Sequence, residues 1–332
     1  MIGARVSRGW WPSWERRGSQ RTATDAGVVA DEGSTRGPTT MAVSTLPVPV
    51  LRLAALLIAA AGGLLFFRQV RYVYPYRPQL ERIQVSVPPA HAGLANLKIA
   101  FLTDSHVGPI ISPAHLTRAT ALLAAERPDL LLLGGDYISE APRYAAEAAD
   151  VLGTLADSTP LGAFAVLGNH DLACGAEAVT AALEAVGIRV LRNAAAEVMT
   201  DSGPLWIAGI DEAILGAADP AAAFARVPSG AAVLALWHEP DFAEQAAALG
   251  AFAQLSGHSH GGQVRLPWLG PLVLPMGGRR FAAGFNDAAG MPVYTSRGAG
   301  VYRPPIRFRC PAEVTLVTLV APASRSMATD GR

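Results

Sequence analysis

Short apolar runs alternate with helical patterns from residue 95 onwards. Three such runs have the length and composition of buried strands: 97–103, 129–133 and 162–167. A helical pattern follows each of them, at 113–126, 143–156 and 176–186, and Ser112 followed by Pro113 is a typical helix start. Strands that alternate with helices predict an α/β fold built on a parallel sheet with helical crossovers.

The second half of the chain is richer in strand patterns. Apolar runs predict further strands at 205–210, 232–236, 252–255, 292–296 and 314–320. One helical pattern lies among them, at 240–249. The stretch 267–284 is rich in proline and glycine, which is typical of a loop.

A long apolar segment, residues 46–67, precedes the α/β region and contains Arg52 as its one charged residue. At about 1.5 Å per residue, a helix of this length spans roughly 30 Å, the thickness of the hydrocarbon core of a bilayer. We interpret the segment as a transmembrane anchor. A buried core helix and a cleaved signal peptide are the alternatives, but no small-residue cleavage motif follows the segment.

Segments without apolar periodicity lie at both ends of the chain. Residues 1–45 are rich in Arg, Ser, Thr, Gly and Asp, and we expect them and the tail at 323–332 to be disordered. Met41 lies just before the apolar segment, so Met1 and Met41 both stay open as the natural start. Residues 68–94 are predicted to be a linker to a globular domain at 95–322.

Basic residues cluster on the C-terminal side of the predicted anchor: Arg68, Arg71, Arg77 and Arg82. The positive-inside rule therefore favours a single-pass protein of the bacterial inner membrane with its C-terminal domain in the cytoplasm. Arg52 leaves an export signal, and hence an extracytoplasmic domain, as the alternative. Tyrosines alternate with these arginines and suit either the headgroup interface or an ordinary linker: Tyr72, Tyr74 and Tyr76.

Composition narrows the function classes. The chain has 332 residues, enough for one large domain or two modest ones, and 51% of them are apolar. Its formal net charge is +0 and no basic–aromatic stretch stands out as a nucleic-acid site, so we expect no nucleic-acid partner. Cys174 and Cys310 are too few for a disulfide framework or a thiolate metal site.

Polar clusters lie where predicted strands end. They are Asp104-Ser-His106, Gly135-Asp136, Gly168-Asn169-His170-Asp171, His238 and Gly257-His258-Ser259-His260. Ligands collect beyond the carboxyl ends of strands in parallel sheets. Residues two apart in an extended segment point the same way, so His258 and His260 can face one site.

These clusters contain the ligand types that hard and borderline divalent cations take: Asp104, His106, Asp136, Asn169, His238, His258 and His260. The set is large enough for two metal ions that share a bridging carboxylate. Two metals about 3.5–4 Å apart lower the pKa of a bridging water and clamp the oxygens of a displacement at phosphorus, which favours a phosphate substrate. Taken singly, each residue has a simpler structural reading, such as a strand-end cap, a turn residue or a core histidine.

The order of these motifs resembles that of the calcineurin-like metallophosphoesterase family: Asp-x-His, Gly-Asp, Gly-Asn-His-Asp, a lone His and Gly-x-His-x-His. The resemblance covers residues 97–320. Three further runs look like the membrane-linked branch of phosphodiesterases and UDP-2,3-diacylglucosamine pyrophosphatases: 257–267, Ser296-Arg297-Gly298 and Pro305-Ile306-Arg307-Phe308. The family fold implies a four-layer αββα sandwich here, preceded by the N-terminal transmembrane helix.

The resemblance also implies roles for the site residues. One metal position is matched by Asp104, His106, Asp136 and His260, and the other by Asp136, Asn169, His238 and His258, with Asp136 as the bridge. His170 matches the family's non-ligand histidine, a catalytic residue that would donate to the phosphoryl oxygen or the leaving group, and Asp171 would orient it. The cofactors would be two divalent ions of manganese, iron or zinc.

The expected activity is hydrolysis of a phosphodiester or pyrophosphate bond by a metal-bridging hydroxide. The predicted anchor favours a lipid-linked substrate, and several arginines could hold additional phosphates: Arg265, Arg279, Arg280, Arg297 and Arg303. Two alternatives stay open. One is a non-catalytic membrane scaffold that retains the fold, and the other is a hydrolase of soluble nucleotides or phosphomonoesters.

Overall fold

The computed structural model describes residues 47–322, so the segments expected to be disordered, 1–45 and 323–332, lie outside the described residues. The chain is divided into two units, with the boundary between Leu53 and Ala54. The described part of the first unit is the beginning of α1, Val48–Arg68, which has no buried residue. This helix is long and apolar enough to cross a membrane. Two short helices follow it in the second unit, η1 Gln69–Val73 and η2 Tyr74–Tyr76.

The first sheet contains β1 Gln79–Ser86, β14 Glu313–Val320, β2 Lys98–Leu102, β3 Leu130–Leu133, β4 Ala163–Ala165 and β5 Arg189–Val190, in that order across the sheet. Neighbouring strands are parallel except that β14 runs antiparallel to β2. Strand β3 consists of leucines that are all buried, as expected for a central strand covered on both faces.

The second sheet contains β12 Gly284–Ala288, β13 Met291–Thr295, β9 Ala253–Ser256, β8 Ala232–Trp237, β7 Gly203–Ile210 and β6 Ala194–Thr200. Its central pairs are parallel, whereas the edge strands β12 and β6 are antiparallel to their neighbours. A separate small hairpin is formed by β10 Arg265–Leu266 and β11 Gly270–Pro271.

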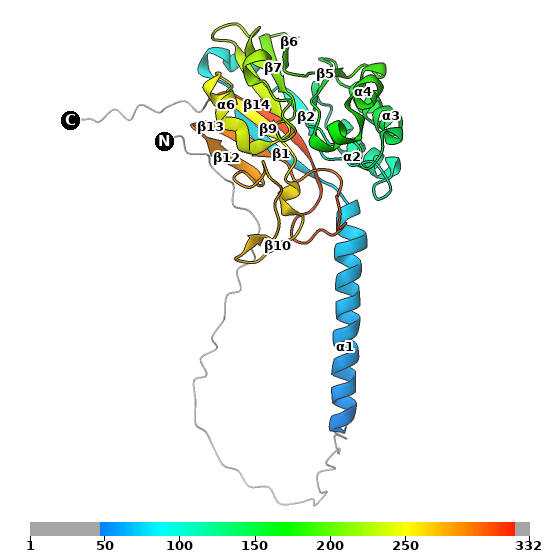
Figure 1. Cartoon of the computed structure of the whole chain (residues 1–332). Helices are drawn as coiled ribbons and strands as arrows, with labels where there is room; N and C mark the ends of the chain where they lie inside the picture. The colour runs from blue at the N-terminus through cyan, green and yellow to red at the C-terminus, as the bar shows by residue number, and fades with distance from the viewer. Residues whose placement is uncertain (1–46, 323–332) are drawn as a thin grey trace, which may run out of the picture. The chain divides into compact units, whose positions relative to one another are not determined.

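Helices cover the outer face of each sheet (Figure 1). Apolar residues of α2 Pro113–Ala124, α3 Ala145–Ala156 and α4 Asn169–Ala185 pack with one face of the first sheet. The second sheet packs in the same way against α5 Pro220–Phe224 and α6 Ala243–Ala248. A third apolar cluster joins the inner faces of the two sheets, including Phe101 from one and Ile207 from the other. The order of layers is therefore helix, sheet, sheet, helix, which confirms the predicted αββα sandwich.

Short helical turns complete the connections: η3 Pro89–Leu94, η4 Pro142–Tyr144, η5 Pro240–Phe242 and η6 His260–Gly262. The last of these lies inside one of the predicted ligand motifs. It bends the chain sharply, because Gly261 has a φ of 60°.

Three local predictions differ from the structure. The range expected to be a linker, 68–94, contains β1, which pairs along its whole length with β14. The alternation of apolar residues in β1 is too weak to predict a strand, which forms through its pairing with β14. The range of α4 begins at Asn169 rather than at residue 176, because a short helical segment precedes the predicted helix and Gly175, whose φ of 137° is not helical, forms a kink between the two. Part of the stretch 267–284 forms the small hairpin and the beginning of β12.

Candidate metal centre

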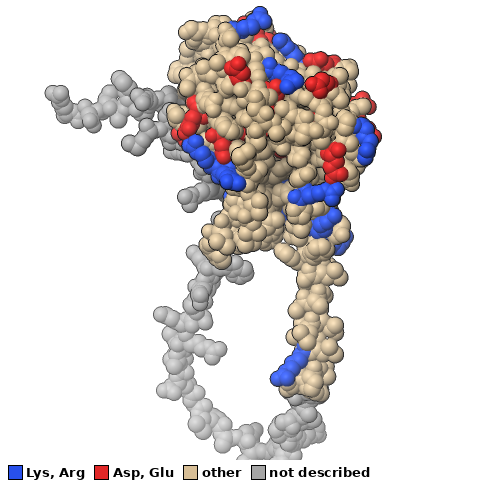
Figure 2. Space-filling model, in the orientation of Figure 1, with Lys and Arg blue, Asp and Glu red and all other residues tan. Residues whose placement is uncertain are grey.

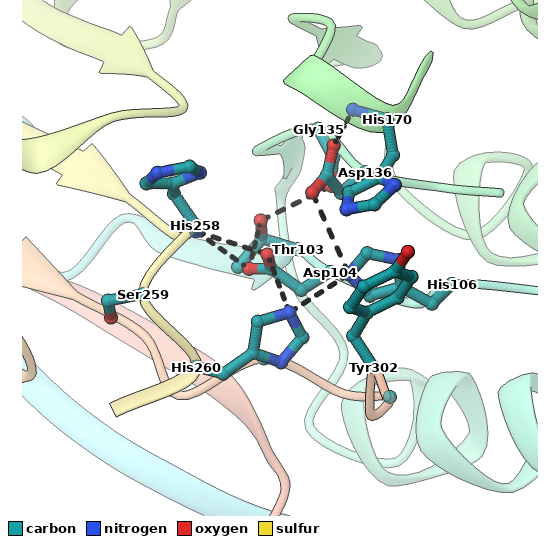
Figure 3. A network of polar contacts seen from close by, with 12 residues as sticks. Thr103, Asp104, His106, Gly135, Asp136, His170, His258, Ser259, His260 and Tyr302 are labelled. Carbon is teal, nitrogen blue, oxygen red and sulfur yellow. Dashed lines mark hydrogen bonds and ion pairs between the residues drawn. The ribbon is translucent and has the colours of Figure 1, made fainter. Parts of the chain in front are cut away.

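The predicted ligand residues come together in space from loops that follow five different strands. Figure 3 labels Asp104, His106, Asp136, His258 and His260 at this site. Three groups have ligand atoms that lie within 4.8 Å of one another: Asp104, His106 and His260; His106, Asp136 and His170; and Asp136, His238 and His258. Asn169 joins the third group, because its Oδ1 lies 2.9 Å from His258 Nδ1. Every residue predicted as a ligand is therefore present at one site.

Two clusters can be distinguished, and Asp136 belongs to both. We call Asp104, His106 and His260 the first cluster, and Asn169, His238 and His258 the second cluster. In the first, His106 Nε2 lies 2.9 Å from His260 Nε2 and 3.7 Å from Asp136 Oδ2. In the second, His238 Nε2 lies 3.2 Å from the same Asp136 Oδ2. One carboxylate oxygen thus faces both clusters.

Several residues at this site have a positive φ angle, a backbone conformation that residues other than glycine rarely adopt. The φ angles are 53° at Asp104, 49° at His106, 56° at Asp136, 68° at His258 and 50° at His260. Such residues cost on the order of 1–3 kcal/mol each and persist where the surrounding structure holds them. Their concentration at one site is typical of a functional centre.

Glycines allow the loops to approach this closely. A Cβ atom at Gly257 would overlap Asp104 Oδ2, and one at Gly168 would overlap Asp136 Oδ1. These two glycines are therefore required by packing against the carboxylates.

The hydrogen bonds of the second cluster fit a cation. His238 Nδ1 lies 2.6 Å from the carbonyl oxygen of Gly134, so it carries the proton and donates it. In the neutral ring Nε2 is then a bare acceptor, and it is buried without a hydrogen-bond partner while it faces the Asp136 carboxylate. Two facing acceptors repel each other unless a cation or a proton lies between them.

The same pattern recurs at His258. Its Nε2 lies 2.7 Å from the carbonyl oxygen of Met276 and therefore carries the proton, which leaves Nδ1 as an acceptor that faces Asn169 Oδ1. The donor set of imidazole nitrogen, amide oxygen and carboxylate oxygen suits divalent manganese, iron or zinc. The residues present therefore fit the predicted metals.

Burial and the neighbouring charges set the charge of each group in the site. It lowers the pKa of His106 to about 3 and that of His258 to about 4, so both imidazoles are neutral near pH 7. Burial also opposes the charged form of Asp136, but His238 and then His106 outweigh it and hold the pKa of this carboxyl well below its usual value. Two groups differ, because Asp136 outweighs burial and raises the pKa of His238 well above its usual value, and burial raises the pKa of Asp104 to about 7. Metal binds neutral imidazoles and ionised carboxylates, so a bound ion would displace the protons that these two groups hold.

His170 lies beside the first cluster, on the first turn of α4. Its ring centroid is 4.9 Å from that of His106 and 4.4 Å from that of Tyr302, and its backbone N–H donates to Asp136 Oδ1 at 2.8 Å. The side chain is half-buried, whereas His106 and Asp136 beside it are buried. It is thus placed to meet a substrate.

The role expected for Asp171 needs correction. Its carboxylate accepts hydrogen bonds from the backbone N–H groups of Asp136 at 2.7 Å, Tyr137 at 2.9 Å and Gly168 at 3.0 Å. Among the described contacts, no hydrogen bond joins it to the His170 ring. A carboxylate at the third position of a helix commonly caps the helix start. Asp171 does so here and also ties the Asp136 loop to α4, so it positions Asp136 rather than the His170 ring.

Some residues of the site were not predicted as functional. The Tyr302 ring packs on His106 and His170, and its backbone N–H and C=O are both bound by the side-chain amide of Gln263, at 2.8 and 3.1 Å. Arg307 is fully buried, and its guanidinium donates to several carbonyl oxygens and lies 3.3 Å from His260 Nδ1. Only the resemblance of the run 305–308 pointed to this segment.

The arginines considered for phosphate binding are mostly engaged elsewhere. Arg297 pairs with Glu81 and Glu313. Arg280 pairs with Glu244 at 2.8 Å, Arg303 with Glu140 at 2.7 Å, and Arg265 donates to the carbonyl oxygen of Gly261 at 3.0 Å. These contacts support the fold, and the expectation that the arginines hold additional phosphates gains no support from them.

Comparison with known proteins identifies relatives with the same motifs. The family model for calcineurin-like phosphoesterases matches residues 97–209. The phosphodiesterase YaeI of Escherichia coli is 33% identical over 81% of this chain and 97% of its own length. The uncharacterized metallophosphoesterase YkuE of Bacillus subtilis is 29% identical over 80% of this chain and 93% of its own length.

A relative with a membrane segment in its name is also similar. The transmembrane protein with metallophosphoesterase domain of Danio rerio is 27% identical over 73% of this chain and 57% of its own length. The similarity extends well beyond the isolated ligand motifs.

Proposed function

Because this chain belongs to the calcineurin-like phosphoesterase family, we propose that it hydrolyses a phosphodiester or pyrophosphate bond with two metal ions that share Asp136. It is a metal-dependent phosphoric ester hydrolase, as the resemblance of its motifs implied. The observation that carries the finer proposal is the pair of acceptor atoms that face each other in the second cluster, next to a first cluster that converges on the same carboxylate.

These distances support the ligand sets that we propose. We assign one ion to the first cluster and the other to the second cluster, with Asp136 reaching both. When bound, the ions supply Lewis-acid stabilisation of charge on the phosphoryl oxygens and activate water at neutral pH. The chain itself supplies the buried, neutral imidazoles and the strained loops that hold them in place.

His170 is the group we assign to proton transfer. Its backbone is held by Asp136 and its ring rests against Tyr302, so the imidazole is oriented without a carboxylate partner. A histidine at the open edge of the site can donate a proton to the oxygen of the leaving group. Tyr302 limits the rotation of that ring.

The lipid-linked substrate is a proposal supported by α1. A helix that is long and apolar enough to cross a membrane would keep the site near lipid headgroups. The arginines that follow α1 support a protein of the inner membrane whose C-terminal domain lies in the cytoplasm. A phosphatase fused to the C-terminus should therefore be inactive, whereas a cytoplasmic reporter should be active. The opposite result would overturn the orientation.

The activity is tested with the full chain in detergent. We expect bound metal by elemental analysis, and hydrolysis of bis-p-nitrophenyl phosphate that rises with Mn²⁺ and stops with a chelator. A detergent-dispersed lipid pyrophosphate should be turned over faster than a water-soluble analogue. Equal rates would remove the support for a lipid-linked substrate and leave the phosphoesterase assignment intact.

The competing proposal, a membrane scaffold, predicts a different outcome. It requires bound metal without turnover of any ester, including lipid, nucleotide and phosphomonoester substrates. The facing acceptors favour bound metal under both proposals, because such a polar centre is costly to bury without a cation, so turnover is the result that decides between them.

A further inference from the structure

One projection of the domain exposes apolar side chains almost completely. We call residues 265–276 the apolar hairpin, since they contain β10 and β11 and no charged residue after Arg265. Trp268 is fully exposed, Leu269 and Val273 are each 76% exposed, and Leu272 and Met276 are more than half exposed. Contiguous apolar patches of this kind mark interaction surfaces in soluble domains.

The apolar hairpin is tied to the metal centre at both of its ends. At one end, Leu272 N–H donates to the carbonyl oxygen of Val264 at 3.0 Å, and Gly262 packs so closely that an added Cβ would lie 2.5 Å from Pro271. At the other end, the carbonyl oxygen of Met276 accepts from His258 Nε2 at 2.7 Å. The exposed tip therefore projects from the loop that carries the second-cluster histidine.

The base of the apolar hairpin also shares a segment with the end of α1. The ring of Phe66, near the end of α1, lies 5.3 Å from that of Phe308. Arg265 N–H donates to the carbonyl oxygen of Phe308, and Arg307 N–H donates to that of Val70, both at 3.0 Å. The end of α1 and the base of the apolar hairpin thus both contact the segment 307–308.

The residues at the end of α1 have the character of a membrane interface. Arg68 closes the helix, and Arg71 stacks on Tyr72 with its guanidinium 4.7 Å from the ring centroid. Basic and tyrosine side chains of this kind anchor helices at the headgroup level. On the visible face in Figure 2, the projection that carries β10 in Figure 1 is tan, whereas basic side chains gather where the chain leaves α1.

We propose that the apolar hairpin inserts into the surface of the lipid bilayer and seats the metal centre at that surface. We infer that the apolar hairpin contacts a bilayer rather than a second protein. The reason is that the hairpin and the end of α1, a helix long and apolar enough to cross a membrane, both contact the segment 307–308. Rigid aromatic and aliphatic side chains at the tip suit the boundary of headgroups and acyl chains. The insertion is independent of the reaction, whereas its effect on lipid substrates rests on the proposed function.

Fluorescence of Trp268 tests the insertion directly. The full chain is reconstituted in vesicles of phosphatidylcholine and phosphatidylglycerol with brominated acyl chains, and the Trp268→Phe variant supplies the background from the other tryptophans. We expect the emission assigned to Trp268 to be quenched by the brominated lipid and shielded from aqueous iodide. Quenching by iodide alone would overturn the proposal, as would shielding from both quenchers that depends on protein concentration, which would indicate pairing of two copies.

Turnover supplies the second test. The Leu269→Ser/Val273→Ser variant should lose about fivefold in turnover of a phosphodiester lipid in vesicles, since apolar residues contribute to insertion roughly in proportion to their number. Its turnover of bis-p-nitrophenyl phosphate should stay unchanged. Met199→Ser, on the exposed edge strand β6, is the matched control and should change neither rate.

The two tests separate the two proposals. An unchanged rate on the vesicle substrate in the double variant would overturn a role for the apolar hairpin in reaching lipid. If the wild-type chain hydrolyses neither substrate, the proposed function fails, and the fluorescence of Trp268 still decides whether the apolar hairpin inserts.

Discussion

The first and second clusters converge on the same carboxylate. They differ in the group that contacts the far nitrogen of each imidazole ring, which is the nitrogen that points away from the other ligands. In the second cluster, the far nitrogens of His238 and His258 each donate to a backbone carbonyl oxygen, at 2.6 and 2.7 Å. In the first cluster, the far nitrogen of His106 meets the Ser139 hydroxyl at 2.9 Å, and that of His260 faces the guanidinium of Arg307.

This difference determines which tautomer each ring prefers. A carbonyl oxygen can only accept, so it holds the proton on the far nitrogen and leaves the near nitrogen free to bind metal. A hydroxyl can donate or accept, and a guanidinium can only donate. The guanidinium therefore favours the His260 tautomer with its proton on Nε2, the nitrogen that faces Asp104. A bound ion would have to displace that proton, so we expect the first cluster to bind its ion more weakly than the second.

The largest effect should come from the residue that the two clusters share. Asp136→Ala removes the one carboxylate that faces both, so we expect both steps of a calorimetric titration with Mn²⁺ to disappear and hydrolysis to fall to background. Asp150→Ala, on the exposed face of α3, is the matched control. If one ion still binds to a folded Asp136→Ala chain with wild-type affinity, the two clusters are independent and Asp136 is not shared.

A smaller loss is expected from the histidine beside the first cluster. His170→Ala should retain both metal-binding steps and lower turnover by about 10²–10⁴, the usual contribution of general acid–base catalysis. Because the His170 ring is close to His106 and Asp136, ligation is the rival explanation. Loss of one titration step in His170→Ala, but not in the control His91→Ala, would make His170 a ligand.

The Ser139 hydroxyl, which contacts the far nitrogen of His106, allows a further test of the difference in affinity between the two clusters. Ser139→Ala should weaken the lower-affinity titration step by about tenfold and leave the other step unchanged, since partners behind a ligand typically contribute 10–100-fold to metal affinity. Ser158→Ala, a serine outside the site, serves as control. Weakening of the higher-affinity step would reverse the proposed order of the two clusters.

The ligand residues could be predicted because they follow strands that are evident from short apolar runs. Asp104 and Asp136 come shortly after buried strands, and the carboxyl ends of parallel strands must meet at one edge of a sheet. The direction of each side chain could not be predicted in the same way. Asp171 was assigned to its sequence neighbour His170, but the helix turn places its carboxylate against the backbone of Asp136 instead.

Features that depend on residues distant in the sequence could not be predicted from local patterns either. Strand β1 has little apolar alternation and exists through its pairing with β14, which is far away in the sequence. Tyr302 and Arg307 carry no motif that names their role, since one is defined by ring packing on His170 and the other by carbonyl oxygens around a buried guanidinium. The exposed tip of the apolar hairpin looked like an ordinary proline-rich loop.

The smallest expected effect concerns a hydroxyl that supports the first cluster from the carboxylate side. Thr103 is fully buried, and its Oγ1 donates to Asp104 Oδ2 at 2.8 Å. Thr103→Val keeps the shape but removes this donor, and a net loss of about 1 kcal/mol for one hydrogen bond corresponds to about fivefold in affinity. The lower-affinity Mn²⁺ step should weaken by that amount, while Thr103→Ser should restore it because the hydroxyl returns. Equal weakening of both steps would mean that the substitution disturbs the whole loop, including Gly134 and Gly257, which pack directly on Thr103. Thr154→Val, on the exposed face of α3, should leave both steps unchanged.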